Sequence, residues 1–352
     1  MKGKKTNKKG FLGITSRVLM LIVAGLLAFS YVSMFINPSK IWWFTLFGLM
    51  FIPFTIFNFV LLLWAIKRRS KTFVIPLLAI ATSTLFIGRY FQTGEKEYES
   101  SDEPLLKVVS YNVGRFSNCS QDSLFAYINA LSPDIVCLQE YYISDIAKVR
   151  EELRRQMKGY KSEFYLFPMA DGSAFGNVTL SRMQVKGKGK IKFDESANLA
   201  IYTDYEFRGR KFRVYNCHFE SYSISLPGLL RGLFQADKAA VAETGTRMKR
   251  SITRRPKQVD KVFEDIERCP VEAFVCGDFN DDPMSYTYFR MTRGRKDSFR
   301  EAGSGFGATF ARLWPLLRID YILLPDRFEA IEHQVPRVRY SDHFPVVSTI
   351  EL

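Results

Sequence analysis

The chain has 352 residues, of which 47% are hydrophobic and 24% charged, and this composition excludes a protein that is disordered throughout. Its net charge of +14 would by itself indicate nucleic-acid binding. Residues 1–94, however, contain 12 Lys and Arg and no Asp or Glu, whereas residues 95–352 contain 38 basic and 36 acidic residues. The positive charge therefore belongs to the N-terminal quarter, and the body of the protein is nearly neutral.

Three apolar segments in the N-terminal quarter, residues 18–36, 41–66 and 72–88, are predicted to be transmembrane helices. The first two are long enough, because a span needs about 20 apolar residues. The third is shorter and contains Pro76, so it is the weakest of the three. A cleaved signal peptide is a poorer interpretation, because further apolar segments follow the first. Residues 1–92 are therefore expected to form a membrane anchor.

The basic residues that flank these segments predict an orientation. Six Lys and Arg precede the first segment, and Lys67, Arg68, Arg69 and Lys71 lie between the second and the third. The positive-inside rule places both groups in the cytoplasm. Three spans then put everything after about residue 90 outside the cytoplasm, whereas two spans would leave the body inside. We expect an integral membrane protein with a cytoplasmic N-terminus and an extracytoplasmic body.

Residues 93–104 are predicted to be a polar linker, and residues 105–352 a single α/β or α+β domain. Short runs rich in Val, Ile and aromatic residues predict strands at 105–111, 134–139, 177–180, 211–218, 273–277 and 319–324. Helices are expected at 121–131, 144–157 and 257–268. The five cysteines are interpreted as small hydrophobic side chains, since their odd number excludes complete internal pairing.

Two basic segments and one apolar segment have less specific patterns. Residues 186–192 and 208–213 are interpreted as solvated hairpin turns, with nucleic-acid contact as the alternative. Residues 226–234 (LPGLLRGLF) lie in an insertion between two predicted strands. They are interpreted as a packed helix or a cover for the sheet, and the alternative is a lip that dips into the membrane beside the active site.

Polar residues end or interrupt most of the predicted strands. These residues are Asn112, Glu140, His218, Asp278, Asn280, Asp320, Asp342 and His343. Singly, each is explained as a cap, a turn residue or a satisfied core residue. Together, they would cost several kcal/mol to bury unless they bind one another or an ion. The pattern therefore predicts a shared polar site.

The order of these segments resembles that of a known family. The segments are SYNV, LQE, GNVTLSR, a strand containing a His, GDFN, IDYI and a terminal SDHFPV. In this order they resemble the endonuclease/exonuclease/phosphatase superfamily over residues 105–352. The resemblance implies an α+β fold, a four-layer α/β/β/α sandwich with its site at one end of the two packed sheets, preceded here by the N-terminal transmembrane helical anchor.

The resemblance also implies a role for each polar residue in phosphate ester hydrolysis. Glu140, Asn112 and Asp342 are the expected ligands of Mg²⁺ or Mn²⁺. The expected catalytic residues are His218, Asp278, Asn280, Asp320 and His343. In these roles Asp278 orients or deprotonates the attacking water, Asn280 and His218 donate to phosphoryl oxygens, and Asp320 orients His343. Asn177 is expected near the site, and His333 on the surface.

Three functions are compatible with these features. The first is a membrane-anchored, divalent-metal-dependent phosphoesterase that hydrolyses phosphodiester or phosphomonoester bonds of a phospholipid or another small phosphoester. The second is a membrane-tethered nuclease that degrades extracytoplasmic DNA or RNA. The third is an inactive binding module, which is disfavoured because no site position is lost. The expected partners are the lipid bilayer, through the N-terminal helices, and a phosphoester substrate, either a phospholipid headgroup or nucleic acid.

Overall fold

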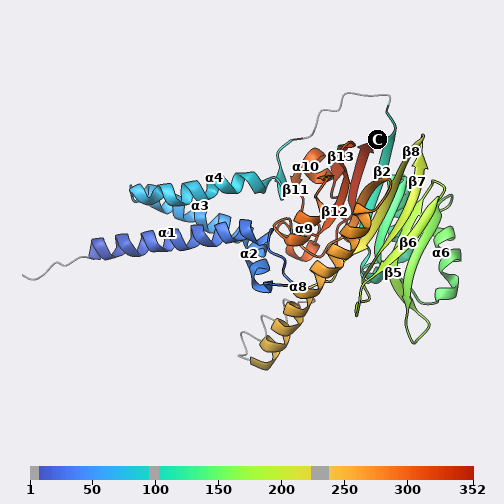
Figure 1. Cartoon of the computed structure of the whole chain (residues 1–352), viewed down its shortest axis with the longest axis horizontal. Coiled ribbons are helices and arrows are strands. Elements are labelled where there is room, and N and C mark those ends of the chain that lie inside the picture. Colours follow the sequence, from blue (N-terminus) through green and yellow to red (C-terminus); the bar gives the residue numbers. More distant parts are fainter. Residues whose placement is uncertain (1–7, 95–102, 223–237) are drawn as a thin grey trace, which may run out of the picture. The chain divides into compact units, whose positions relative to one another are not determined.

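The computed structural model describes residues 8–94, 103–222 and 238–352 (Figure 1). It divides into two compact units. The N-terminal unit comprises Met1–Gly88 with Met284–Tyr286, and the second unit comprises Arg89–Pro283 with Thr287–Leu352.

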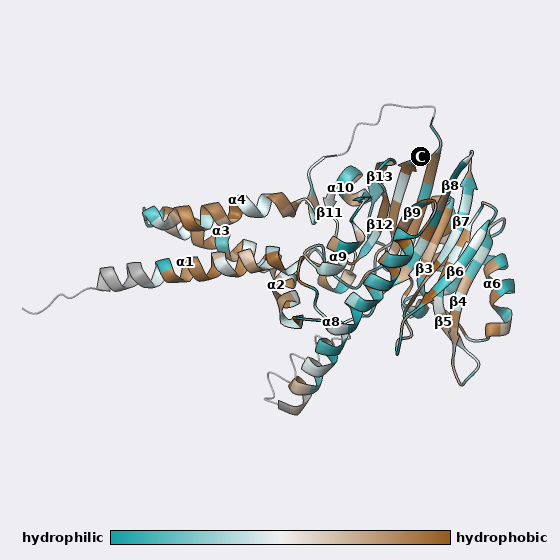
Figure 2. Cartoon of the chain, in the orientation of Figure 1, coloured by the Kyte–Doolittle hydropathy of each residue, from teal (hydrophilic) through white to brown (hydrophobic). Residues whose placement is uncertain are grey.

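The N-terminal unit consists of apolar helices. They are α1 (Lys8–Ser33), the 3-10 helix η1 (Trp42–Phe44), α2 (Thr45–Leu49), α3 (Phe51–Lys67), the 3-10 helix η2 (Lys71–Phe73) and α4 (Val74–Ile87). In Figure 2 the coloured part of α1 and the helices α3 and α4 are mainly brown, which marks hydrophobic residues. A buried amide joins two of these helices, because Asn58 in α3 donates from Nδ2 to the Val23 carbonyl of α1 at 3.3 Å.

The length of these helices supports membrane insertion only weakly. Among the described residues, one helix, Thr15–Ser33, is long and apolar enough to cross a membrane, and a signal sequence would pass the same test. The predicted span 41–66 is instead a pair of helices, Trp42–Leu49 and Phe51–Lys67, bent by 52°. Pro53 explains the break, since its ring conflicts with the carbonyl of Leu49 in a continuous helix. The predicted segment 72–88 forms a short apolar helix.

The second unit contains two mixed six-stranded sheets (Figure 1). One sheet has the order β10-β12-β9-β8-β7-β6, with β6 (Gly187–Lys192), β7 (Leu199–Phe207), β8 (Arg210–His218), β9 (Glu272–Asp278), β10 (Arg295–Asp297) and β12 (Asp320–Pro325). The other has the order β13-β14-β2-β3-β5-β4, with β2 (Leu105–Asn112), β3 (Ile135–Ile143), β4 (Lys161–Pro168), β5 (Ala174–Ser181), β13 (Glu329–Gln334) and β14 (Val346–Glu351). Among the described strands, only β2–β3 and β8–β9 pair in parallel.

Successive side chains of each strand point to opposite faces of its sheet. This alternation places one hydrophobic core between the sheets and one on each outer face. The inner core contains Leu106 and Val108 of β2 and Phe212 and Val214 of β8. The next residues along, such as Val109 and Tyr215, point outward to the helical layers. Those layers are α5 (Gln121–Leu131) with α6 (Val149–Gln156), and α8 (Lys238–Glu267) on the other side. The fold is therefore the expected α/β/β/α sandwich.

The shortest elements complete the second unit. They are β1 (Phe91–Gln92), which pairs with β11 (Gly305–Phe306), the 3-10 helices η3 (Gly114–Phe116), η4 (Ile146–Lys148) and η5 (Ala311–Leu313), and the helices α9 (Tyr286–Met291) and α10 (Ser298–Ala302).

Several sequence-based expectations are wrong in detail. Within the predicted turn at 186–192, Gly187–Lys192 form the edge strand β6, with lysines on its exposed positions, as is common at sheet edges. Within 208–213, only Arg208 and Gly209 form a turn, where both adopt positive φ. The helix predicted at 257–268 begins at Lys238 and continues through Pro256.

His333 is buried, and the expectation of a surface residue is wrong. The pairing of β13 with β14 shifts register between Ala330 and Glu332, and this bulge turns His333 inward. Its Nδ1 lies 2.8 Å from Ser298 Oγ.

The predicted lip at 226–234 and most of the predicted linker at 93–104 lie outside the described residues. The cysteines are free, and Cys137, Cys217 and Cys276 are buried, as predicted.

Candidate active site

Polar residues from both sheets meet at one end of the sandwich. The register of β8, β9 and β12 places His218 beside Asp278 and Asp278 beside Asp320. Asn112 ends β2 of the other sheet, and its Nδ2 donates to Asp278 Oδ2 at 2.9 Å. This hydrogen bond joins the two sheets at the site.

Asp278 is the centre of this group. It is fully buried, its Oδ1 accepts from the Asn280 backbone N–H at 2.8 Å, and the Nε2 atoms of His218 and His343 each lie 3.8 Å from its Oδ2. Burial and then the neighbouring Asp320 raise the pKa of Asp278 to about 6, although the two imidazoles and Asn112 act in the opposite direction. Asp278 can therefore exchange a proton near neutral pH.

His343 and Asp320 form a buried pair beside Asp278. Nδ1 of His343 lies 2.9 Å from Asp320 Oδ2. Burial lowers the pKa of His343, but Asp320 and Asp278 outweigh it and raise that pKa to about 10. With Nδ1–H donated to Asp320, the Nε2 of His343 is the nitrogen that faces Asp278.

Two site residues are non-glycine residues with a left-handed backbone. Glu140 has φ of 53° where β3 bulges against β5, between Leu138 and Tyr141, and Asn280 has φ of 52°. Such conformations cost about 1–3 kcal/mol each and gather at functional sites. The bulge lets Glu140 Oε1 approach within 3.5 Å of Asn112 Nδ2 and 3.7 Å of His218 Nε2.

Asn280 makes its contacts within the protein. Its Nδ2 donates to the Phe219 carbonyl at 3.0 Å and to Asp278 Oδ2 at 3.2 Å. Its expected donation to a phosphoryl oxygen stays a prediction.

Glycines allow close approaches that the sequence analysis did not anticipate. Gly277 has φ of 140°, and a Cβ built there would overlap the Cys217 carbonyl oxygen of the neighbouring strand. Gly114 donates its N–H to Asn112 Oδ1 at 3.0 Å, and a Cβ on Gly114 would lie 3.2 Å from Asp342 Oδ1. Gly114 thus lies between Asn112 and Asp342, two of the predicted metal ligands.

A network of buried side-chain amides connects the two sheets next to the site. Gln139 donates from Nε2 to Asn216 Oδ1 at 2.8 Å, and Asn216 Nδ2 donates to the carbonyls of Leu138 and Val178. Asn177, which was expected near the site, donates to the Leu199 carbonyl, and Leu199 is the strand partner of His218. Amides in strands are not distinctive in sequence, so only their position in the fold identifies this network.

Thr309 is a further residue that sequence reasoning missed. Its Oγ1 accepts from the backbone N–H groups of Ile319 and Asp320 at 3.0 and 3.1 Å. Its carbonyl accepts from the Phe344 N–H at 2.7 Å. Thr309 therefore fixes the backbone on both sides of the Asp320–His343 pair.

The residues at the site fit a divalent cation. In the part of the chain that the structure describes, Asp278, Asp320 and His343 can each offer a ligand atom, and these atoms lie within 4.8 Å of one another. Oδ1 of Asp320 is buried and accepts no hydrogen bond from a described residue. A buried carboxylate oxygen without a donor is suited to a cation. This group differs from the predicted ligands Glu140, Asn112 and Asp342, which border it through Asn112.

Comparison with known families decides the classification. A model described as the endonuclease/exonuclease/phosphatase family matches residues 109–343. The chain belongs to this family. It is an endonuclease/exonuclease/phosphatase family phosphoesterase, a hydrolase with a buried Asp/Asp/His cluster. Residues 11–90 match a domain of unknown function, and no curated protein sequence matches the chain.

Solved structures of the endonuclease/exonuclease/phosphatase family share the fold. An endonuclease/exonuclease/phosphatase from Beutenbergia cavernae is 20% identical with a TM-score of 0.52, covering 70% of this chain and 72% of that one. One from Bacteroides vulgatus is 17% identical with a TM-score of 0.52 and covers 71% and 100%. The human nocturnin catalytic domain with a bound sulfate anion is 17% identical with a TM-score of 0.51 and covers 70% and 93%. At these identities, the likeness concerns the fold alone.

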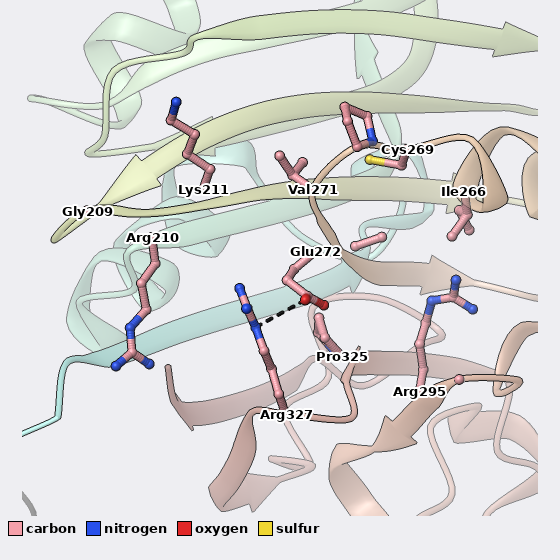
Figure 3. A pocket seen from close by; sticks show the side chains of 13 residues that line it. Gly209, Arg210, Lys211, Ile266, Cys269, Val271, Glu272, Arg295, Pro325 and Arg327 are labelled. Atoms are coloured by element: carbon pink, nitrogen blue, oxygen red, sulfur yellow. Dashed lines mark ion pairs between the residues drawn. The ribbon is translucent and has the colours of Figure 1, made fainter.

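A cavity of about 660 Å³ lies away from this family site (Figure 3). It is lined by Arg210 and Glu272, which begin β8 and β9, whereas His218 and Asp278 end those strands. Figure 3 shows Arg327 paired with Glu272, at 3.1 Å. The cavity is therefore at the opposite end of the sheet from the buried Asp/Asp/His cluster.

Proposed function

We propose that this protein is a membrane-anchored, divalent-metal-dependent phosphoesterase that hydrolyses an ester bond of a phospholipid headgroup. The observation that carries the hydrolytic part is the Asp320–His343 pair, in which Nε2 of His343 lies 3.8 Å from Oδ2 of the buried Asp278. An oriented imidazole beside a carboxylate is what proton transfer during phosphate ester hydrolysis requires.

The proposed roles follow from the contacts. Asp278 accepts the proton of the attacking water, and Asn112 and Asn280 hold its carboxylate in place. His343 donates from Nε2 to the phosphate as charge develops, with its ring fixed by Asp320. His218, whose Nε2 lies between Glu140 and Asp278, donates to a second oxygen.

The proposed metal ligands are Glu140, Asn112 and Asp342. Their carboxylate and amide oxygens suit Mg²⁺ or Mn²⁺, and Gly114 keeps Asn112 and Asp342 close together. When bound, the cation neutralises the charge on the phosphoryl oxygens. The Asp278, Asp320 and His343 group is the second place where a cation can bind.

The membrane assignment rests on the N-terminal unit, with residues 1–92 as the anchor and residues 105–352 as the catalytic domain. The exposed side chains of α1, α3 and α4 include Leu21, Phe57 and Leu85. A soluble protein would not expose so many large apolar side chains on consecutive helices. Our proposed topology has three spans, a cytoplasmic N-terminus and an extracytoplasmic catalytic domain.

A lipid substrate is favoured over nucleic acid because of charge. Residues 95–352 have 38 basic and 36 acidic residues and so lack a general attraction for a polyanion. A substrate within the bilayer is concentrated by the anchor itself.

The test is a substrate panel for the purified full-length chain in detergent micelles with Mg²⁺ or Mn²⁺. Phospholipids, plasmid DNA and RNA are compared at low and high salt, with His343→Ala as the control. We expect release of a phosphorylated headgroup, or of inorganic phosphate from a lipid monoester, which the variant lacks. Cleavage of nucleic acid that declines steeply with salt would instead identify a nuclease.

A further inference from the structure

Exposed apolar side chains of the second unit lie close to one another in space or in the chain. They are Phe91 of β1, Phe306 of β11, and Leu313, Trp314 and Leu316 of the segment that follows Phe310, and we call them the aromatic patch. Their exposed fractions lie between 37% and 47%. The Phe91 and Phe306 rings are 5.0 Å apart, and those of Phe306 and Trp314 are 5.9 Å apart. Single exposed apolar residues are ordinary, but a contiguous group indicates an interaction surface.

One arginine contacts the tryptophan of the aromatic patch, and two further arginines lie nearby in the chain. The Arg337 guanidinium lies 4.3 Å from the centre of the Trp314 ring. Arg312, next to Leu313 in the chain, has a side chain that is 72% exposed and lies 3.5 Å from Asp342 Oδ2, and Arg339 is also exposed. Large apolar side chains combined with Trp and Arg are typical of surfaces that enter the headgroup region of a bilayer with anionic lipids.

The aromatic patch is connected to the catalytic residues through the backbone. Phe310 forms a β-bridge with His343, and their rings are 5.2 Å apart. The next residue, Ala311, donates its N–H to the Asp342 carbonyl at 2.9 Å. The Leu317 carbonyl closes the segment by accepting from the N–H groups of Thr309 and Phe310. Leu313, Trp314 and Leu316 thus follow, within six residues, the Phe310 that bridges His343.

The position of the aromatic patch in the chain indicates that it contacts a bilayer. Phe91 follows Ile87, where α4 ends, by four residues, and four extended residues span at most about 14 Å. With α4 in a membrane, as our proposed topology has it, β1 lies near the membrane surface. The pairing of Phe91 with Phe306 then brings the rest of the aromatic patch to the same surface.

We propose that the aromatic patch is a membrane-contact surface that rests on a bilayer containing anionic phospholipid and presents lipid headgroups to His343 and Asp278. This inference rests on the proposed function and names the structure that delivers the substrate. It assigns the membrane contact to residues 311–316 with Phe91 and Phe306, rather than to residues 226–234.

Tryptophan fluorescence tests the contact without reference to activity. The chain has four Trp residues, so replacing Trp42, Trp43 and Trp64 by Phe leaves Trp314 as the single emitter. The full chain is reconstituted in phosphatidylcholine/phosphatidylglycerol vesicles with or without brominated acyl chains. We expect brominated lipid to remove most of the Trp314 emission, with the further Trp314→Phe variant defining the background.

Two results of that experiment would overturn the proposal. Quenching by aqueous acrylamide without quenching by brominated lipid would place Trp314 in water. Protection from both quenchers would mean that protein covers the aromatic patch, either another part of the chain or a second copy.

A pair of variants tests whether the contact delivers substrate. Leu313→Asp with Leu316→Asp is compared with Leu105→Asp with Ile146→Asp, two similarly exposed residues away from the aromatic patch. The first pair should lower hydrolysis of phospholipid in vesicles by roughly tenfold or more, because charge replaces two membrane-buried leucines. It should leave hydrolysis of soluble bis(4-nitrophenyl) phosphate unchanged, and the control pair should change neither activity.

The results separate this inference from the proposed function. An equal change of both activities in the first pair, or no change in either, would overturn substrate delivery by the aromatic patch. If the wild-type chain hydrolyses the soluble ester but no lipid, the proposed substrate is wrong, and delivery with it. Quenching of Trp314 would then still establish the membrane contact alone.

Discussion

Individual side chains at the site depend on partners that hold them in one orientation. His343 can present either ring nitrogen, and the hydrogen bond from Nδ1 to Asp320 at 2.9 Å selects Nε2 for the reacting side. Thr309 in turn fixes the backbone of Asp320. Asp320 is therefore a positioning residue, because it acts on the phosphate through His343.

Replacing Asp320 by Asn tests this role. The amide can donate to Nδ1 and so favours the other tautomer, and we expect kcat to fall by about 10²–10⁴. KM should change little, whereas the unfolding temperature should fall, because Asn cannot balance the buried charge of His343, whose pKa Asp320 raises. Steady-state kinetics on a soluble phosphodiester separates kcat from KM, and an unchanged kcat would contradict the assignment.

Gly277 allows the close approach of β9 to β8 beside Asp278. A Cβ at this position would overlap the Cys217 carbonyl oxygen of the neighbouring strand. Gly277→Ala should therefore lower the free energy of unfolding by more than about 3 kcal/mol. Gly159→Ala is the matched control, since Gly159 also has positive φ but no atom within 4 Å, and it should cost only about 1–2 kcal/mol. Denaturant unfolding measures both, and equal losses would show that strain at φ alone is responsible.

At the level of elements, the sequence predicts the strands that carry the site and misses most of the others. The predicted runs become β2, β3, β5, β8, β9 and β12, and the helix predicted at 121–131 is α5. These strands are apolar on both faces because they are covered by the other sheet and by helices. The edge strand β6 alternates Lys with Gly and Ile, so its sequence looks like a turn.

The sequence predicts only those site residues that interrupt apolar strands. Strand-end residues such as Asp278 and Asp320 are visible in sequence because they interrupt apolar runs, and the structure brings them together. Gly277 and Thr309 act through backbone geometry, and this geometry cannot be predicted from the type of residue. The roles of the site residues and the identity of the metal ligands remain predictions.

The burial of His333 depends on a β-bulge, which cannot be read from the sequence. Its environment also leads us to expect a pH dependence of stability. Burial first, and then Arg318, lower the pKa of His333 from its usual 6.5 to about 3 in the folded protein. Between these values the unfolded chain binds a proton that the folded chain does not. The contribution of His333 to stability should therefore fall as the pH falls from 6.5 towards 3.

A variant isolates the contribution of His333. In His333→Gln the unfolding temperature should drop less than in the wild type when the pH is lowered from about 7.5 to about 5. Gln keeps a polar group near Ser298 but does not titrate. Thermal unfolding followed by circular dichroism gives the comparison, and identical drops in the two proteins would show that His333 does not contribute.

At the scale of the whole molecule, an apolar N-terminal unit precedes a hydrolase of the endonuclease/exonuclease/phosphatase family. Our proposed topology places the catalytic domain outside the cytoplasm, and this depends on whether α4 crosses the membrane. Asp194→Cys puts a reactive thiol at an exposed position of the catalytic domain. A membrane-impermeant maleimide should label it equally fast in intact and in lysed cells, with the wild-type chain as the background. Labelling only after lysis would place the domain in the cytoplasm.

The central claim is that the residues at the ends of the sheets form a metal-dependent phosphoester hydrolase. Its most direct test is hydrolysis of bis(4-nitrophenyl) phosphate by the purified full-length chain, first in EDTA and then with Mg²⁺ or Mn²⁺ added back. The account predicts no activity in EDTA, recovery with the cation, and at least about a 10²-fold lower rate in His343→Ala under every condition. Activity that survives EDTA, or a His343→Ala variant that is as active as the wild type, would contradict it.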